Sequence, residues 1–264
     1  ATGDTVWEGR AATPDDVAEA MAAARLAFPA WAKRPVEERA AIARAFAKAI
    51  EKHGDELART ISREMGKALW DARGEVQAMI GKVEISISAQ AERAGAKEEK
   101  NAFGVTVLAH HPHGVLAVFG PFNFPGHLPN GHIVPALLAG NCVLFKPSEF
   151  TPGVAALMVE AWEEAGLPNG VLALLQGARE TGAALLDAPG LNGVLFTGSA
   201  QTGSLIHRKF AGRPEVLLAL ELGGNNPLIV WPPVDVNAAA NLIVHSAFAT
   251  SGQRCSCARR LIVP

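Results

Sequence analysis

A reactive thiol is the first chemistry that this sequence offers. Cys255 lies in the segment 251–257, which follows a long apolar stretch and precedes the strand-like run 261–263. A cysteine on a loop beyond a helix is accessible, and as a thiolate it is a strong nucleophile. Two other interpretations stay open. Cys255 and Cys257 could be small apolar residues near a strand, or metal ligands, although no second Cys or His pair lies at ligand spacing.

Two further polar side chains follow strand-like runs. Glu221 comes directly after the run 216–220, at the edge where open α/β sheets bind ligands, and desolvation there would raise the pKa of its carboxyl toward that of a general base. Asn123 follows the run 115–119 between two prolines, and its amide could donate a hydrogen bond to a developing oxyanion. Each also has a structural interpretation, since Glu221 could bond turn amides and Asn123 could stabilise a turn.

Two other strand ends carry residues suited to a nucleotide. Residues 198–203 follow the run 194–196 and open a helix, so backbone N–H groups and the positive helix end could hold a phosphate. Glycine is also common in such turns for packing alone. Residues 146–149 end the run 142–145, where Lys146 could bond ribose hydroxyls or phosphate, or be a solvated strand end.

The histidines predict no metal site. Those clustered at 110–113 lie on an extended segment, where neighbouring side chains point to opposite sides. His127 and His132 lie close to Asn123 in sequence and could line a pocket or fill it. Trp162 and Trp231 lie in apolar contexts and are predicted to be core or packing residues.

These candidates need a scaffold, and the pattern from residue 115 onward predicts a parallel sheet. Short β-branched and aliphatic runs alternate with helical stretches, which favours right-handed crossovers. Several runs lack polar alternation, as expected of strands buried on both faces. The fold class is therefore α/β, with strands at 115–119, 142–145, 171–175, 194–196, 216–220 and 228–231 and helices at 154–165, 201–211 and 236–249.

The first hundred residues are richer in charge and predict amphipathic helices that cover this sheet. Thr13 before Pro14 marks a helix start. The face of that helix is indicated by apolar residues three and four apart, namely Val17, Met21, Ala24 and Phe28. Residues 94–112 differ, because a charged turn at 97–101 precedes the strand-like run 105–108. They predict a projecting β arm.

Composition excludes several classes of protein. The chain has 264 residues, 24 Lys plus Arg, 26 Asp plus Glu and 49% hydrophobic residues, an ordinary globular profile. A formal charge of −2 disfavours nucleic-acid binding. No apolar run approaches the roughly 18 residues of a membrane-spanning helix, so no membrane partner is expected. Three cysteines form no even disulfide framework, and with no signal-peptide pattern we expect a cytoplasmic protein.

Taken together and in this order, these stretches resemble the NAD(P)-dependent aldehyde dehydrogenase superfamily over essentially the whole chain. The motifs that carry the resemblance are Gly-Pro-Phe-Asn-Phe-Pro at 120–125, Lys-Pro-Ser-Glu at 146–149, Phe-Thr-Gly-Ser at 196–199, Glu-Leu-Gly-Gly at 221–224 and Gly-Gln-Arg-Cys at 252–255. The resemblance implies a Rossmann-like open parallel sheet with helices on both faces and a small-molecule aldehyde as substrate. It also implies NAD as cofactor, with NADP less favoured, and a homodimer or higher homo-oligomer.

The resemblance also gives roles to individual residues. It implies that Cys255 is the nucleophile, that Asn123 is the oxyanion-hole amide and that Glu221 is the base for thioester hydrolysis, with no metal. Glu149, as an acceptor from the adenosine ribose, would repel a 2′-phosphate and favour NAD. The cofactor contacts that it implies are Phe122, Lys146, Ser148, Glu149, Gly198, Ser199, Gly203, Leu222 and Gly223.

A division into domains follows from the same resemblance. Residues 1–93 and 113–222 would form the dinucleotide-binding domain, 94–112 the oligomerisation arm, and 223–264 the beginning of a second α/β domain, the catalytic domain. Family members are nearly twice this length, so most of the catalytic domain would lie outside these residues. For the 264 residues alone we expect exposed apolar surface and poor solubility or no activity.

Two departures mark a branch of the family. Most relatives have Trp in place of Phe122 and Lys in place of Asn225, and these differences resemble a branch that oxidises a semialdehyde in arginine catabolism. Three alternatives stay open. They are a CoA-acylating dehydrogenase, which the presence of Glu221 disfavours, a non-catalytic nucleotide-binding module, and a zinc or thiol-redox protein that uses Cys255 and Cys257.

Overall fold

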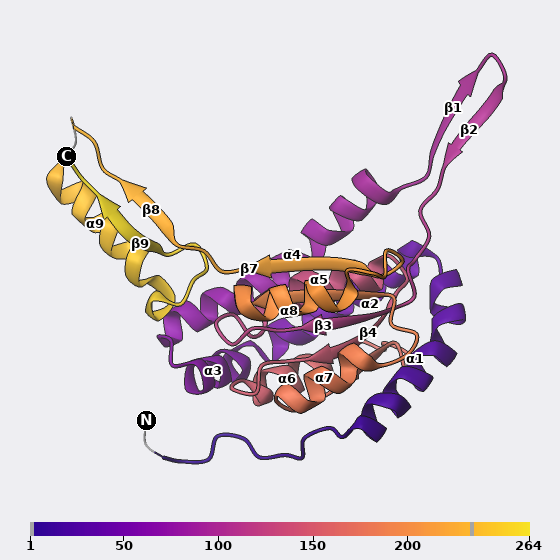
Figure 1. The fold of residues 1–264 in the computed structure, drawn as a ribbon, viewed down its shortest axis with the longest axis horizontal. Coiled ribbons are helices and arrows are strands. Elements are labelled where there is room, and N and C mark those ends of the chain that lie inside the picture. Colours follow the sequence, from indigo (N-terminus) through magenta and orange to yellow (C-terminus); the bar gives the residue numbers. More distant parts are fainter. Residues whose placement is uncertain (1–2, 233–234) are drawn as a thin grey trace.

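A five-stranded parallel sheet lies at the centre of the molecule (Figure 1). The structure, a computed structural model, describes residues 3–232 and 235–264; residues 1, 2, 233 and 234 of the expected domains lie outside the described part. The strand order is β5-β4-β3-β6-β7 and every neighbouring pair is parallel. The strands are β3 (Val115–Phe119), β4 (Cys142–Lys146), β5 (Leu172–Leu174), β6 (Gly193–Gly198) and β7 (Leu217–Leu222). The predicted α/β class is confirmed.

Strands β3 and β4 are buried along their whole length, as runs without polar alternation predict. The chain leaves β3 toward β4 and β5, then returns and continues on the other side of β3 with β6 and β7. Strand order therefore reverses between β3 and β6, and right-handed crossovers place the connecting helices on opposite faces. These helices are α5 (His127–Leu138), α6 (Pro152–Glu164), α7 (Arg179–Asp187) and α8 (Ala200–Phe210).

Four helices precede the sheet, and the first of them contacts it directly. Thr13 caps the first of them, and its hydroxyl accepts a hydrogen bond from the Asp16 N–H at 3.2 Å, which confirms the predicted start. The first packs against β4 and α7, whereas the other three pack on one another and on α5 and α6. The four helices are α1 (Pro14–Lys33), α2 (Val36–Lys52), α3 (Gly54–Met65) and α4 (Leu69–Ala94).

The core confirms one predicted tryptophan and corrects the other. Trp162 is buried and stacks on Phe46 with ring centroids 4.0 Å apart. Trp231 is 68% exposed, so its expected place in the core is wrong. It lies just beyond β8 (Asn226–Ile229), outside the central sheet, where no layer of described residues covers it.

A two-stranded hairpin projects from the body, at the upper right of Figure 1. Its strands β1 (Lys97–Asn101) and β2 (Gly104–Leu108) are antiparallel, and all ten residues are exposed. The expected charged turn at 97–101 is wrong, because these residues pair with β2 as a strand and the turn falls at residues 102 and 103. The hairpin lies within the expected arm.

The C-terminal part stands away from the central sheet (Figure 1). It comprises β8, α9 (Val236–Phe248), a 3₁₀ turn at Ala249–Gly252 and β9 (Ala258–Ile262), with β8 and β9 paired in parallel as a separate sheet. Every residue of α9 is exposed or half-buried. The apolar side chains that it and its neighbours expose include Ile229, Val236, Leu242, Val244, Phe248 and Leu261.

Candidate active site

A cavity of about 1090 Å³ lies at the carboxyl edge of the sheet. Its lining comes from the ends of β3, β4, β6 and β7, the start of α8 and residues 253–255. Ligand sites of roughly 300–1,000 Å³ are usual, and open α/β sheets bind ligands where strand order reverses. The predicted site residues that line this cavity are Phe122, Asn123, Lys146, Ser148, Glu149, Gly198, Ser199, Glu221, Leu222, Gly223 and Cys255.

Gly203 is the predicted cofactor contact that the lining of this cavity does not include among the described residues. It is buried in α8, and a Cβ at this position would lie 2.4 Å from Leu222 Cδ2. Its missing side chain therefore lets α8 approach β7 closely. Gly203 shapes the site through packing, and the structure offers no contact to a ligand in the cavity.

The segment before Cys255 has an unusual backbone. Thr250 and Ser251 have φ values of 56° and 53°, and Gly252 follows at 70°. Left-handed conformations cost a threonine or serine free energy and occur mostly where surrounding contacts enforce them, often at functional sites. Thr250 is buried and its hydroxyl accepts a hydrogen bond from Arg254 Nε at 2.9 Å. This turn presents Cys255 as an exposed residue at the cavity.

The other two cysteines are not accessible. Burial raises the pKa of the Cys142 thiol to about 12. Cys257 is 1% exposed, and its Sγ lies 3.7 Å from the Ala249 carbonyl oxygen. Of the three thiols, Cys255 alone combines exposure with a place at the cavity. This agrees with its predicted role.

Asn123 is fixed directly to the cysteine loop. Its Nδ2 donates a hydrogen bond to the Gln253 carbonyl oxygen at 2.7 Å, across 130 positions of sequence. An amide nitrogen carries two hydrogens, so one N–H stays available for an oxygen in the cavity. The same contact holds the loop after β3 and the segment before Cys255 in a fixed relation.

The sequence predicts that Glu221 directly follows a strand. The structure instead places it within β7. It pairs with Thr197 in the register of β6 and β7, and it is exposed in the described structure. The Glu221 carboxyl is therefore not desolvated by the described residues, because β7 is the edge strand and its outer side is open. The carboxylate still lines the cavity.

His132 is a neighbour of Glu221 that the sequence left undecided. It lines the cavity, and its Nε2 lies 3.0 Å from the hydroxyl of Thr197, the residue paired with Glu221. Burial lowers the pKa of the His132 imidazole, and the charge of Glu221 opposes this shift. The imidazole is thus neutral near neutral pH. Its position in α5, ten residues before β4, gives no sequence signal for this contact.

The other end of the cavity suits a nucleotide. Lys146 is 7% exposed, with its Nζ 2.6 Å from the Pro147 carbonyl oxygen and 3.7 Å from Glu149 Oε2. Burial lowers the pKa of Lys146, which Glu149 opposes. Ser199 caps α8, since its hydroxyl accepts from the Thr202 N–H at 3.1 Å. A cation, a carboxylate and a helix N-terminus in one cavity are the groups that bind the phosphates and ribose of a dinucleotide.

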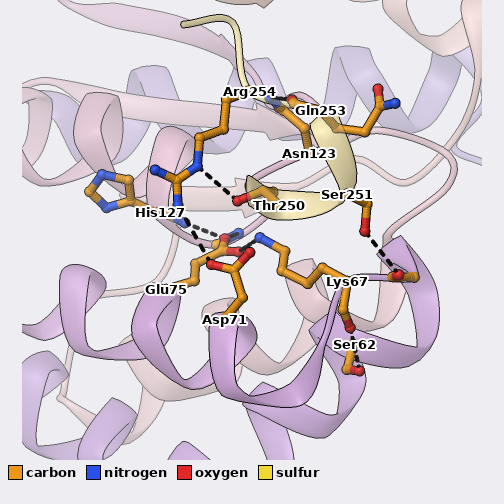
Figure 2. A network of polar contacts seen from close by, with 12 residues as sticks. Ser62, Lys67, Asp71, Glu75, Asn123, His127, Thr250, Ser251, Gln253 and Arg254 are labelled. Atoms are coloured by element: carbon orange, nitrogen blue, oxygen red, sulfur yellow. Dashed lines mark hydrogen bonds and ion pairs between the residues drawn. The ribbon is translucent and has the colours of Figure 1, made fainter. Parts of the chain in front are cut away.

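A network of buried polar side chains lies next to the loop after β3 and the segment before Cys255 (Figure 2). Lys67 Nζ donates to Glu75 Oε2 at 2.6 Å, and both side chains are completely buried. Glu75 Oε1 accepts hydrogen bonds from the N–H groups of Gly126 at 2.9 Å and His127 at 3.0 Å. The carboxylate of Glu75 on α4 therefore caps α5, which begins four residues after Asn123. Sequence reasoning missed this pair, because nothing local relates residue 75 to residue 126.

Metal ligands do not gather in the described part of the chain. Among residues 3–232 and 235–264, no three His, Cys, Asp or Glu side chains form a group that could hold a metal ion. Nor does any helix in these ranges have the length and apolar character needed to cross a membrane.

Comparison with known proteins identifies the family. The model of the aldehyde dehydrogenase family matches residues 1–264. An N-succinylglutamate 5-semialdehyde dehydrogenase of Pseudomonas fluorescens (strain Pf0-1) is 59% identical over 263 residues, covering 100% of this chain and 54% of the relative. Another of that name, from Ectopseudomonas mendocina (strain ymp), is 60% identical over 259 residues, covering 98% and 53%. The chain thus spans about half the length of the curated relatives it matches.

Solved structures agree with this match. A methylmalonate-semialdehyde dehydrogenase from Oceanimonas doudoroffii superposes with a TM-score of 0.90 at 33% identity, over 96% of this chain and 52% of that one. A structure described as an NADP-dependent enzyme of E. coli gives 0.93 at 32%, over 99% and 55%. The chain belongs to the aldehyde dehydrogenase family.

Proposed function

We propose that this chain provides the dinucleotide site and the nucleophile of an enzyme that oxidises N-succinyl-L-glutamate 5-semialdehyde to N-succinyl-L-glutamate with NAD. One observation carries the proposal: Cys255, Asn123 and Glu221 line the same cavity as the N-terminus of α8. The names of the relatives at 59% and 60% identity support this substrate. Because the chain spans about half of those relatives, the activity is proposed for the complete polypeptide as encoded.

In the first half of the reaction, the thiolate sulfur of Cys255 adds to the aldehyde carbon and forms a C–S bond as the carbonyl π bond breaks. The carbonyl oxygen becomes negative, and the free N–H of Asn123 and the backbone N–H of Cys255 donate hydrogen bonds to it. Loss of one such donor costs roughly 3 kcal/mol of transition-state stabilisation. When bound, NAD supplies the acceptor for the hydride that leaves this carbon, and a thioester on Cys255 remains.

In the second half, water hydrolyses the thioester. The Glu221 carboxylate accepts a proton from the attacking water, the C–S bond breaks, the carboxylic acid leaves and the Cys255 thiolate is regenerated, while Glu221 gives its proton to solvent. The neutral imidazole of His132 lies beside Thr197, next to Glu221 in the sheet, and contributes a polar wall to this part of the cavity.

The cofactor preference is part of the proposal. Lys146, Ser148 and Glu149 would hold the adenosine ribose, and Gly198 and Ser199 would lie near the pyrophosphate. A ribose 2′-phosphate would meet the Glu149 carboxylate, which is half exposed at 48%, so NAD is favoured over NADP. Homo-oligomeric assembly and a cytoplasmic location also stay predictions.

The test is NADH formation by the complete polypeptide with a panel of semialdehydes. N-succinylglutamate 5-semialdehyde is expected to give the highest kcat/KM, with NAD preferred over NADP. Replacing Cys255 with Ala should abolish turnover, since the covalent route is lost. Full turnover by Cys255→Ala would contradict the proposal, and formation of an acyl-CoA product when CoA is added would favour the CoA-acylating alternative.

A further inference from the structure

We propose that Arg254 is the residue that selects aldehydes carrying a carboxylate, an inference that rests on the proposed aldehyde oxidation. Arg254 directly precedes Cys255 in the chain, and both residues line the cavity. A guanidinium binds a carboxylate through two parallel N–H···O bonds, a geometry that a lysine does not reproduce. A carboxylate on the substrate tail would bind here while the carbonyl carbon reaches the thiol.

The guanidinium has donors to spare. Of its five N–H groups, that of Nε is used by the Thr250 hydroxyl at 2.9 Å. Nη2 lies 3.7 Å from Asp71 Oδ1, which is an ion pair beyond hydrogen-bond distance. Within residues 3–232 and 235–264, the terminal nitrogens of Arg254 donate no hydrogen bond. A partly buried guanidinium with free donors, on a residue that lines the same cavity as Cys255, is suited to an anionic ligand.

The side chain is also held in one orientation (Figure 2). Its guanidinium carbon lies 5.6 Å from the centre of the Phe124 ring, and the bond to buried Thr250 fixes its stem. Its side chain remains 38% exposed. An arginine that is already ordered loses little side-chain entropy when it binds, which favours recognition of a small anion.

The other cationic side chains packed around Arg254 are paired or neutral, whereas Arg259 is a further cation of the cavity lining. Lys67 Nζ also lies over the Phe124 ring, 4.0 Å from its centre. Its charge is compensated by Glu75 at 2.6 Å, with both side chains buried. Burial lowers the pKa of His127, which is therefore neutral near neutral pH. Asp71 is the acidic group that faces Arg254, at 3.7 Å. This long ion pair orients the guanidinium but leaves its terminal N–H groups without a hydrogen-bond acceptor among the described residues.

The test compares two four-carbon aldehydes that differ in charge, succinic semialdehyde and butanal, in the complete polypeptide with NAD. For Arg254→Gln, kcat/KM for succinic semialdehyde is expected to fall by about tenfold or more, mainly through KM, while the value for butanal stays within about threefold. Arg254→Lys should recover part of the loss. The matched control is Arg208→Gln, which removes an exposed charge on α8 and should leave kcat/KM unchanged for both aldehydes.

Each other outcome is distinguishable. If the values for both aldehydes fall together, Arg254 holds the cysteine loop and selects nothing. If neither falls, or if the selective loss appears instead in Arg259→Gln, which alters a second cation of the cavity lining, the assignment to Arg254 is wrong. Absence of NADH with either aldehyde in the unmodified protein would contradict the proposed function itself. A second measurement needs no variant: added NaCl should raise the KM for succinic semialdehyde and leave that for butanal unchanged.

Discussion

The three cysteines occupy three different environments, which makes their reactivity a direct test at the scale of single residues. Cys255 is exposed at the cavity, Cys257 is 1% exposed, and burial raises the pKa of Cys142 to about 12. Because the thiolate is the reactive form, iodoacetamide should modify Cys255 first in the native protein. Peptide mass spectrometry over a time course measures this. Cys257→Ala should leave the labelling rate unchanged, and equal labelling of Cys142 would contradict the assignment.

Stability at mildly acidic pH should depend on His132. Its pKa is lowered from the ordinary 6.5 by burial, so the unfolded state takes up the proton first as pH falls. Stability from the neutral imidazole is thus present above about pH 6.5 and is lost as pH falls through the lower, folded-state pKa. Urea unfolding at a series of pH values should show a shallower acid decline for His132→Gln than for the unmodified protein.

Two comparisons sharpen the pH experiment. His207 is exposed on α8, so His207→Gln should keep the original pH profile. His127 is also shifted downward by burial, and its contribution should remain in the His132 variant. A profile for His132→Gln that overlays that of the unmodified protein would show that the imidazole carries no pH-dependent stability.

At the scale of elements, carboxylates from the N-terminal helices organise the strand-to-helix turns of the sheet. Glu75 of α4 caps α5, and Glu64 of α3 accepts hydrogen bonds from the N–H groups of Gly153 at 2.8 Å and Val154 at 3.0 Å at the start of α6. Neither helix has a side-chain N-cap of its own. These charge-rich helices thus do more than pack on α5 and α6, because their carboxylates satisfy backbone donors at the starts of both helices.

The buried Lys67–Glu75 pair gives the energetic test of this arrangement. Lys67→Met would leave a buried carboxylate without its cation and is expected to lower the free energy of unfolding by about 3–5 kcal/mol. The double variant Lys67→Met/Glu75→Gln should lose less than the sum of the single changes, because no uncompensated charge remains. Denaturant unfolding of the unmodified protein, Lys67→Met, Glu75→Gln and the double variant measures this.

The exposed pair Arg44–Glu84 is the matched control for this cycle. Its side chains are 51% and 61% exposed, so Arg44→Met should leave the free energy of unfolding nearly unchanged. Additive effects at Lys67 and Glu75 would show that the two side chains stabilise the fold independently.

Sequence reasoning located the elements because each depends on a local pattern. Apolar runs placed β3 and β4, and Thr13 with Pro14 placed the start of α1. It was wrong where pairing or cover decides. Residues 97–101 read as a charged turn but form a strand because β2 pairs with them, and Trp231 is exposed because no described layer covers it.

The candidate site shows the same limit. Cys255, Asn123 and Glu221 stand in short motifs, so their residue types could be recognised, and the structure places all three at one cavity. The contacts that fix them join distant positions, such as Asn123 to Gln253 across 130 residues, and no local pattern encodes them. Gly203 lies in a motif that predicts cofactor contact, but in the structure its lack of a side chain lets α8 pack closely on β7.

At the scale of the whole molecule, the hairpin of β1 and β2 has no partner within the described chain. All ten residues of its strands are exposed, and an isolated two-stranded hairpin is marginally stable in water. Val105 and Val107 are 57% and 56% exposed on β2. The exposed strand edge and these apolar side chains fit the predicted contact with a second copy of the chain.

Changing those two valines should weaken the proposed assembly. Val105→Ser/Val107→Ser is expected to shift the complete polypeptide toward a smaller assembly, measured as molar mass by light scattering after size-exclusion chromatography. Leu26→Ser is the control, because Leu26 is 85% exposed on α1, away from the hairpin. An unchanged mass for the double variant would argue against the arm as an association element.

Cys255, Asn123 and Glu221 are expected to act together on an aldehyde, and the fate of the acyl group in Glu221→Gln tests this most directly. Without the carboxylate that accepts a proton from water, hydrolysis should slow by roughly 100-fold or more while the first half of the reaction proceeds. Rapid mixing of the complete polypeptide with NAD and semialdehyde should therefore give a burst of one NADH per active site, and mass spectrometry should find the acyl group on Cys255. Steady turnover at the original rate, or an acyl group on any other residue, would contradict the account.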